Sequence, residues 1–225
     1  PMRYHEWVAG RVAHTRDRSG GRVGYVHVPD MVARGWAEFH RLIDAAMRCE
    51  AVVVDVRFNA GGHTSELVIE RLSRRAVGWN GARHHDDVTT YPSQAARGPV
   101  VFLTNAYAGS DGDIVTAAAQ ELGLGPVVGE RSWGGVVGID GRFTLVDGTE
   151  VTQPRYWIAF DSYGFGLENH GVDPDIVVET GPGEWESDGD VQLDRAIDEA
   201  LSRLEERPAA HPPQFNAARF ARKAD

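Results

Sequence analysis

The feature that most constrains the fold is an apolar run rich in β-branched residues, Ala51-Val-Val-Val-Asp-Val-Arg57. A strand with one face in water alternates apolar and polar residues, whereas a nearly continuous apolar run indicates a strand covered on both faces. Helix-like sequence follows at 65–76. A second apolar run at 99–105 leads into alanine-rich helical sequence from Asp111. Strands that alternate with helices predict an α/β fold with a core of parallel strands and right-handed crossover helices.

The rest of the chain extends this pattern. The further elements that we expect are a strand at 22–28, a helix at 36–47, a strand at 126–128, a β-hairpin around Asp147-Gly148 and an amphipathic helix at 190–206. Residues 78–98 are polar and are expected to form a loop. We divide the 225 residues into a connector from a preceding module (1–21), one main domain (22–206) and a C-terminal tail (207–225).

Composition argues against several classes of protein. No apolar run reaches the roughly 18–20 residues of a membrane-spanning helix, and residues 1–7 lack the apolar stretch of a signal peptide. The net charge of −10 disfavours nucleic acid and anionic membranes as partners. A single cysteine, Cys49, suits a reducing cytoplasm. We expect no cofactor and no metal, because His84-His-Asp-Asp87 has no partner cluster at metal-ligand spacing and is better explained as a solvated loop.

The candidate chemistry centres on Ser110, in the turn Ala108-Gly-Ser-Asp-Gly-Asp113 between a strand and a helix. A hydroxyl at such a turn points away from the backbone and lies near the positive end of the helix, where negative charge is stabilised. Serine hydrolases often place a nucleophile in this way, although the spacing is not that of the G-x-S-x-G elbow. Taken alone, the segment is better explained as a helix cap, because caps far outnumber nucleophiles.

Two other segments carry residue types that suit the same chemistry. Gly61 and Gly62 follow the first buried strand, and without side chains they would let main-chain N–H groups face a pocket, as an oxyanion hole requires. Glu168 lies in a loop rich in glycine and aromatic residues, where it would orient a base. Each also has a simpler explanation, which is a tight turn for the glycines and a solvated charge for the glutamate.

Five segments in the same order resemble the C-terminal catalytic domain of tricorn-type proteases, serine peptidases related to the C-terminal-processing peptidases. They are Tyr25-Val-His-Val-Pro-Asp-Met31, Asp55-Val-Arg-Phe-Asn-Ala-Gly-Gly62, Ala108-Gly-Ser-Asp-Gly-Asp113, Trp133-Gly-Gly-Val-Val-Gly-Ile139 and Gly166-Leu-Glu-Asn-His-Gly-Val-Asp-Pro-Asp175. The resemblance covers about 22–206. It implies a core of the ClpP and crotonase type, peptide substrates and a homo-oligomer, in this family a hexamer.

The resemblance also implies catalytic roles. Ser110 would be the nucleophile, the N–H groups of Gly62 and Asp111 would be the oxyanion donors, and Glu168 would orient a catalytic histidine. In the wider family a lysine is the base, in a loop that corresponds to 130–138. The only lysine of this chain is in the tail, so a histidine is required.

The histidine has no clear source in this sequence. The four that we weighed do not match the family's base position: His5, His27, His63 and His170. In the tricorn-type family this histidine comes from an earlier subdomain. We therefore expect that the chain is a piece of a longer peptidase whose base lies upstream, or else a degenerate relative.

The resemblance further implies a substrate groove. Gly61, Gly138 and Ile139 would line the part of the groove that pairs with the backbone of a peptide. Hydrogen bonds to the peptide backbone give affinity without requiring a particular peptide sequence. Asn80 stands where archaeal members of the family carry an aspartate that selects basic side chains next to the cleaved bond, so a preference for such side chains is in doubt.

Three functions remain open from the sequence. The leading one is a serine peptidase that cleaves short or unfolded peptides through an acyl-enzyme. The second is a peptide-binding or assembly module that keeps the groove without turnover. The third, an acyl-thioester enzyme of the crotonase type, is weakest because it gives Ser110 no role.

Overall fold

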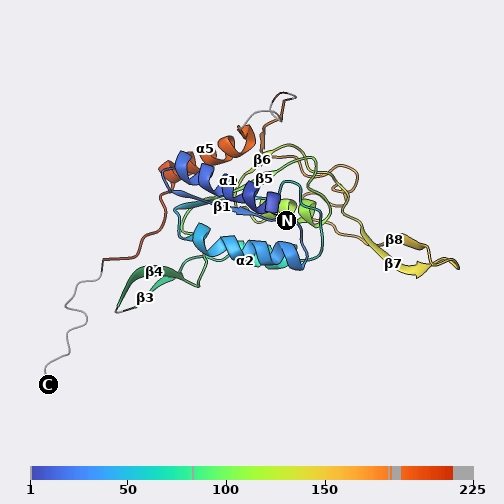
Figure 1. Ribbon diagram of the computed structural model, residues 1–225, viewed down its shortest axis with the longest axis horizontal. Helices are drawn as coiled ribbons and strands as arrows, with labels where there is room; N and C mark the ends of the chain where they lie inside the picture. The colour runs from blue at the N-terminus through green and yellow to red at the C-terminus, as the bar shows by residue number, and fades with distance from the viewer. Residues whose placement is uncertain (1, 83, 182, 184–188, 215–225) are drawn as a thin grey trace, which may run out of the picture.

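A computed structural model describes residues 2–82, 84–181, 183 and 189–214. Its centre is a five-stranded parallel sheet in the order β1-β2-β5-β6-β9 (Figure 1). The strands are β1 (Val23–His27), β2 (Ala51–Asp55), β5 (Val100–Thr104), β6 (Val127–Gly129) and β9 (Ile176–Val177). Every residue of β1, β2 and β5 is buried, as continuous apolar runs predict. The predicted α/β fold is confirmed.

Helices cover both faces of this sheet. They are α1 (Met2–Arg18), α2 (Ala33–Met47), α3 (Ser65–Leu72), α4 (Asp111–Glu121) and α5 (Val191–Glu206). Figure 1 shows α1 and α5 on one side of the sheet and α2 on the other. The α3 and α4 helices pack against each other, which brings together the segments that follow β2 and β5. No helix within the described residues is long and apolar enough to cross a membrane.

Most of the first 21 residues form the helix α1. Val8 and Thr15 are buried, and Tyr4 and Trp7 pack against the main hydrophobic core. The Tyr4 hydroxyl lies 2.9 Å from Nδ1 of His27 in β1. The sequence analysis did not predict this helix, and the role of residues 1–21 as a link to a preceding module stays a prediction.

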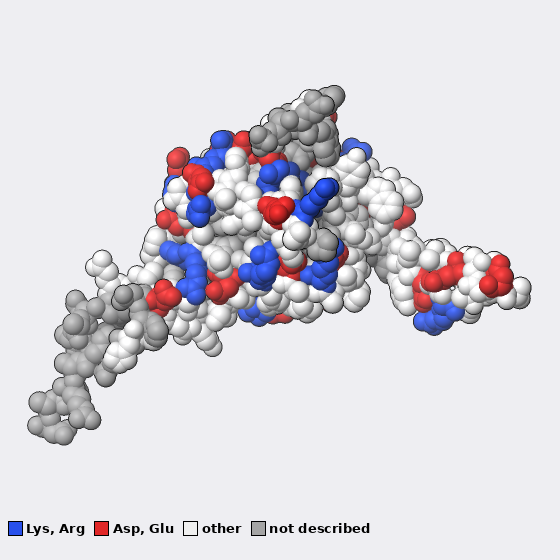
Figure 2. Space-filling model, viewed as in Figure 1, with Lys and Arg blue, Asp and Glu red and all other residues white. Residues whose placement is uncertain are grey.

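The polar segment 78–98 also differs from expectation, because much of it forms an antiparallel hairpin of β3 (Gly78–Ala82) and β4 (His85–Tyr91). A second hairpin, β7 (Gly138–Thr144) with β8 (Glu150–Tyr156), turns at Asp147-Gly148 as predicted. The two hairpins project from opposite ends of the molecule (Figure 1). On the face in Figure 2, acidic and basic side chains are intermixed over the central body.

Candidate active site

Ser110 lies between β5 and α4, and its backbone is unusual. Its φ of 57° and ψ of −119° place a non-glycine residue at positive φ, which is uncommon and often marks a functional turn. Ser110 occupies the N-cap position of α4, yet its side chain makes no capping hydrogen bond. The cap explanation therefore does not account for the hydroxyl. The residue is half-buried, and its Oγ is left free for chemistry.

The turn of Ser110 packs directly on the loop after β2. A Cβ built on Gly61 would lie 2.6 Å from Cβ of Ser110 and 3.0 Å from its Oγ, so only glycine fits there. The N–H of Gly109 donates to the carbonyl of Asn59 at 3.0 Å, and the N–H of Gly61 donates to the Asn59 side chain at 2.9 Å. Asn59 is fully buried and thus fixes both segments.

Gly62 and Asp111 supply two main-chain N–H groups that have no acceptor among the residues the structure describes. Gly62 has a φ of 147°, and a Cβ there would lie 2.1 Å from the carbonyl oxygen of Met31. The flanking bonds to Met31, from Met31 N–H to Gly61 at 2.8 Å and from His63 N–H to Met31 at 2.7 Å, hold this backbone in place. Free N–H groups in a fixed loop are what an oxyanion hole needs.

The side chain of Asp111 joins the two loops. Its carboxylate accepts hydrogen bonds from the N–H of Ser65 at 2.9 Å and from the Ser65 hydroxyl at 2.5 Å. Ser65 begins α3, whose N-cap residue Thr64 makes no side-chain cap. Asp111 therefore caps α3 from a distance while its own N–H stays free, which fixes α4 relative to the Gly61-Gly62 loop.

Asp113, one turn into α4, is a buried residue that sequence reasoning did not single out. Its Oδ1 accepts from the Ser132 hydroxyl at 2.5 Å and from the Gly134 N–H at 2.9 Å. The Ser132 oxygen in turn accepts from the N–H of Val172 at 2.8 Å. Burial raises the pKa of Asp113, although these hydrogen bonds oppose the shift. Asp113 thus anchors the 132–135 loop to the nucleophile helix.

Glu168 is held by the continuation of that same loop. Its Oε2 accepts from the N–H groups of Val136 and Val137, both at 2.8 Å. The N–H of Asn169 donates to the carbonyl of Gly134 at 2.7 Å. The other carboxylate oxygen, Oε1, has no partner within the described part of the chain and is free to accept from an imidazole. The glutamate is thus more ordered than a solvated loop charge.

The remaining predicted site residues lie on the two hairpins. Gly138 and Ile139 begin β7, which pairs with β8 along one edge, and the Ile139 side chain is exposed. Asn80 lies in β3, where its exposed side chain contacts the carbonyl of Thr90 in the same hairpin at 3.5 Å. The structure brings Ser110, Gly61, Gly62 and Asp111 together, but it shows no contact between Asn80 and this group.

No histidine in the described part of the chain hydrogen-bonds to Ser110 or Glu168. His5 lies 3.0 Å from Glu38, and His170 lies 2.8 Å from Asp173. His27 is buried in β1, as expected for a core residue. No group of three or more potential metal ligands occurs among the described residues.

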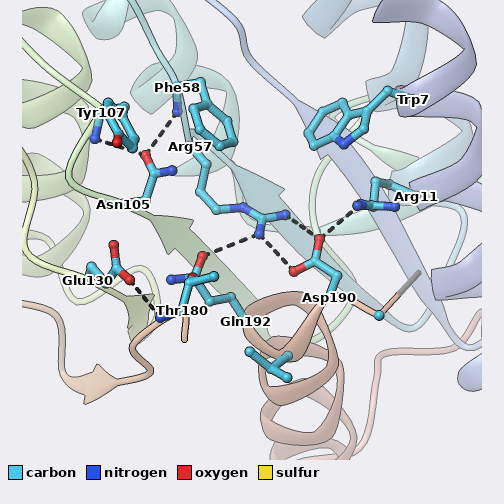
Figure 3. Close-up of a pocket in the computed structure, with 12 residues that line it drawn as sticks. Trp7, Arg11, Arg57, Phe58, Asn105, Tyr107, Glu130, Thr180, Asp190 and Gln192 are labelled. Carbon is cyan, nitrogen blue, oxygen red and sulfur yellow. Dashed lines mark hydrogen bonds and ion pairs between the residues drawn. The ribbon is translucent and has the colours of Figure 1, made fainter. Parts of the chain in front are cut away.

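A cavity of about 260 Å³ lies at the carboxyl ends of the strands, but Ser110 does not line it (Figure 3). Figure 3 shows Arg57 and Arg11 turned toward Asp190. The guanidinium of Arg57 binds the Asp190 carboxylate through both terminal nitrogens, at 2.8 and 2.9 Å, and Arg11 lies 2.9 Å from the same carboxylate. These pairs anchor the start of α5 to the sheet.

The family is decided by a sequence match. Residues 22–178 match the model of peptidase family S41. The chain belongs to peptidase family S41. The resemblance to tricorn-type proteases is thereby confirmed, and so is the prediction of a serine-type peptidase domain.

Comparisons with individual proteins agree with this assignment. Tricorn protease homolog 1 of Streptomyces coelicolor is 56% identical over 215 residues, which cover 96% of this chain and 20% of the relative. The crystal structure of the tricorn protease superposes with a TM-score of 0.87 at 43% identity, covering 91% of this chain and 20% of that one. A putative peptidase from Parabacteroides merdae shares the fold, with a TM-score of 0.60 at 20% identity, covering 84% of this chain and 64% of that one. The chain thus spans about a fifth of the length of its tricorn relatives.

Proposed function

We propose that this chain is the nucleophile-bearing part of a larger peptidase that cleaves short or unfolded peptides through an acyl-enzyme. The observation that carries the proposal is the free hydroxyl of Ser110, on a turn that places Asp111 N–H next in sequence and Gly61-Gly62 in contact. The Ser110 oxygen attacks the peptide carbonyl, and the N–H groups of Gly62 and Asp111 stabilise the resulting oxyanion.

The proton of Ser110 requires a base. We propose a histidine from another part of the larger protein, oriented by the free Oε1 of Glu168. The histidine takes the Ser110 proton during attack and gives it to the leaving amine. It then activates the water that hydrolyses the ester. The lack of a suitably bonded histidine in the described chain, and its coverage of a fifth of its relatives, support this arrangement.

The substrate groove is part of the same proposal. An extended peptide would lie along Gly61 and along the start of β7 at Gly138 and Ile139, where backbone groups recognise a strand of any sequence. Asn80 would belong to the pocket for the side chain next to the cleaved bond. Because Asn80 is a neutral amide, that pocket would attract lysine and arginine less than a carboxylate does.

The cellular setting is also a proposal. We infer a cytoplasmic protein from the single cysteine Cys49, whose thiol is partly covered and has a pKa raised by burial. We infer a homo-oligomer, a hexamer, from the resemblance to the tricorn type. Light scattering coupled to size-exclusion chromatography of the complete protein tests the oligomer.

The test of the peptidase is a fluorophosphonate probe, which reacts with activated serines. The complete native protein is expected to be labelled at Ser110, and the Ser110→Ala variant to lose the label. Ser73→Ala is a matched control, because Ser73 is an exposed serine whose hydroxyl donates to the carbonyl of Ile69. Failure of the complete protein to react would overturn the proposal.

The lack of a base within the described residues favours one alternative, a peptide-binding module without turnover. Calorimetry distinguishes the two functions. If the chain is part of a binding module, the wild-type protein binds peptides without cleaving them. If it is part of a peptidase, only the Ser110→Ala variant binds peptides without cleaving them.

A further inference from the structure

Trp133 is exposed, and the backbone around it leaves room for its ring. The residue is 67% exposed, yet its ring packs closely against two glycines. A Cβ on Gly109 would lie 2.5 Å from Cε3 of the indole, and a Cβ on Gly135 would lie 2.6 Å from Cζ3. Any other residue at either position would displace the ring. Two glycines thus make room for a large apolar side chain that the protein then leaves open to solvent.

The exposure of Trp133 does not come from a loose loop. Ser132 and Gly134, on either side of it, are buried, and both donate to the carboxylate of Asp113. The N–H of Trp133 itself donates to the carbonyl of Ala108 at 2.9 Å. The backbone on both sides is therefore fixed, and the outward direction of the indole is built into the fold. A large exposed apolar group held in this way is typical of a binding surface.

The place of the ring suggests what it binds. Gly109, against which it packs, is the residue before Ser110. A peptide extends by about 3.3–3.6 Å per residue, so the indole lies within reach of the first or second side chain from the bond that Ser110 would attack. The ring offers an apolar face of the kind that packs against apolar and aromatic side chains. The adjacent Arg131 is paired with Asp173 through Nε at 2.6 Å, so its charge is partly balanced within this chain.

We propose that Trp133 is a substrate-binding residue, whose exposed indole receives an apolar or aromatic side chain of the peptide one or two positions from the cleaved bond. The proposal rests on the proposed peptidase function and adds a preference to it. Trp133 lies in the loop between β6 and β7, whereas Asn80 lies on the β3–β4 hairpin, so the two residues would recognise the peptide separately.

The experiment uses the complete native protein and a set of peptides in which one phenylalanine is moved through the positions around the cleaved bond, against an all-alanine background. Trp133→Ala is expected to lower kcat/KM by about tenfold for the peptide with phenylalanine at the matching position, through KM, and to change the others by less than about twofold. Trp133→Phe is expected to restore most of the preference.

Trp157→Ala is the matched control. Trp157 is 73% exposed, similar to Trp133, but its ring packs on Phe165 with ring centroids 5.2 Å apart. Its variant is expected to keep the wild-type preference. An equal loss in both variants would overturn the proposal, since it would show a general effect of removing a surface tryptophan.

Two further readouts separate this proposal from the peptidase proposal. Labelling of Ser110 by fluorophosphonate, which carries no peptide side chain, is expected to be unchanged in Trp133→Ala. In the Ser110→Ala background, calorimetry is expected to show weaker binding of the matching phenylalanine peptide when Trp133 is also replaced. A failure of labelling in the wild type overturns the peptidase alone. Equal binding of the peptide by the two Ser110→Ala proteins overturns the role of Trp133. A Trp133→Ala protein that loses thermal stability but keeps its preference for phenylalanine also overturns it, because the indole then covers another part of the protein.

Discussion

The carboxylate of Asp111 accepts both hydrogen bonds that Ser65 offers, from its N–H at 2.9 Å and from its hydroxyl at 2.5 Å. Asp111 begins the helix after the nucleophile, and Ser65 begins the helix after the Gly61-Gly62 loop. The two proposed oxyanion donors, the N–H groups of Gly62 and Asp111, are therefore fixed relative to each other by the side chain of one of them.

The variants Asp111→Ala and Ser65→Ala should separate the contributions of the two hydrogen bonds between Ser65 and Asp111. Ser65→Ala keeps the N–H bond and should lower the free energy of unfolding by about 1 kcal/mol. Asp111→Ala leaves the start of α3 without a cap and should cost about 1–3 kcal/mol, with slower labelling of Ser110. Urea unfolding and the labelling rate measure these effects. Equal stability of the two variants would contradict this account of the cap.

Gly61→Ala should disable the nucleophile without a general loss of structure. The new Cβ would meet Ser110 at 2.6 Å, and φ at this position is 80°. Because small displacements at a reaction centre are costly, labelling of Ser110 should fall by about 100-fold. Gly10→Ala is the control, since nothing lies within 4 Å of its Cβ position in α1. That variant should label normally and gain about 0.5–1 kcal/mol of stability.

Asp113→Ala should slow the reaction from a buried position. The variant lacks Oδ1, the oxygen that accepts from both the Ser132 hydroxyl and the Gly134 N–H. We expect kcat to fall by about 10–100-fold with KM nearly unchanged, because the fixed loop that orients Glu168 loosens. Steady-state kinetics on one peptide measures the split. A rise in KM alone would contradict a positioning role.

Asn80→Asp tests the proposed pocket for the side chain next to the cleaved bond. A carboxylate there should raise the ratio of kcat/KM for arginine over leucine at that position by about tenfold at low salt, and by less at high salt. Paired peptides that differ only at this position measure the ratio. An unchanged ratio would remove Asn80 from the pocket.

His27 should give the protein a stability that falls toward acidic pH. Burial lowers the pKa of His27, whose Nδ1 lies 2.9 Å from the Tyr4 hydroxyl and whose Nε2 lies 3.1 Å from the carbonyl of Arg57. Below the unfolded pKa of about 6.5, the unfolded chain takes up a proton that the folded chain excludes. Stability is therefore full above that pH and is lost as the pH falls toward the folded pKa.

The variant His27→Gln isolates this effect. Its free energy of unfolding near pH 7 should be lower than that of the wild type, because buried hydrogen bonds are altered. Its further decline between about pH 7 and pH 5 should be smaller than that of the wild type, because no histidine remains at position 27 to take up a proton on unfolding. Urea unfolding at both pH values tests this. Parallel declines in the two proteins would assign the acid sensitivity to other groups.

The central sheet was predictable because its strands are buried on both faces, so the run at 51–57 has almost no polar interruption. The β3–β4 hairpin was missed because its residues are largely exposed and polar, and nothing in such a segment separates a strand from a loop. Helix α1 was missed for a related reason, because within it only Val8 and Thr15 are buried.

The candidate site was predictable where it consists of neighbours in sequence. Ser110 and Asp111 share one turn, and Gly61 and Gly62 share another. Asp113 was not singled out because its function depends on Ser132, 19 positions further along the chain, and a buried carboxylate has no local signature. The position of the Trp133 ring depends on its contact with Gly109, and no sequence pattern links these two residues.

The two projecting hairpins imply that this molecule does not lose its structure all at once. Each is a two-stranded ribbon, and every residue of β8 is exposed, so neither draws much stability from the core. Their amide hydrogens should exchange with solvent long before those of β2 and β5, which are buried throughout. On heating, the two hairpins of the isolated chain should unfold before the central sheet. The start of β7 would then be among the first parts to lose its structure.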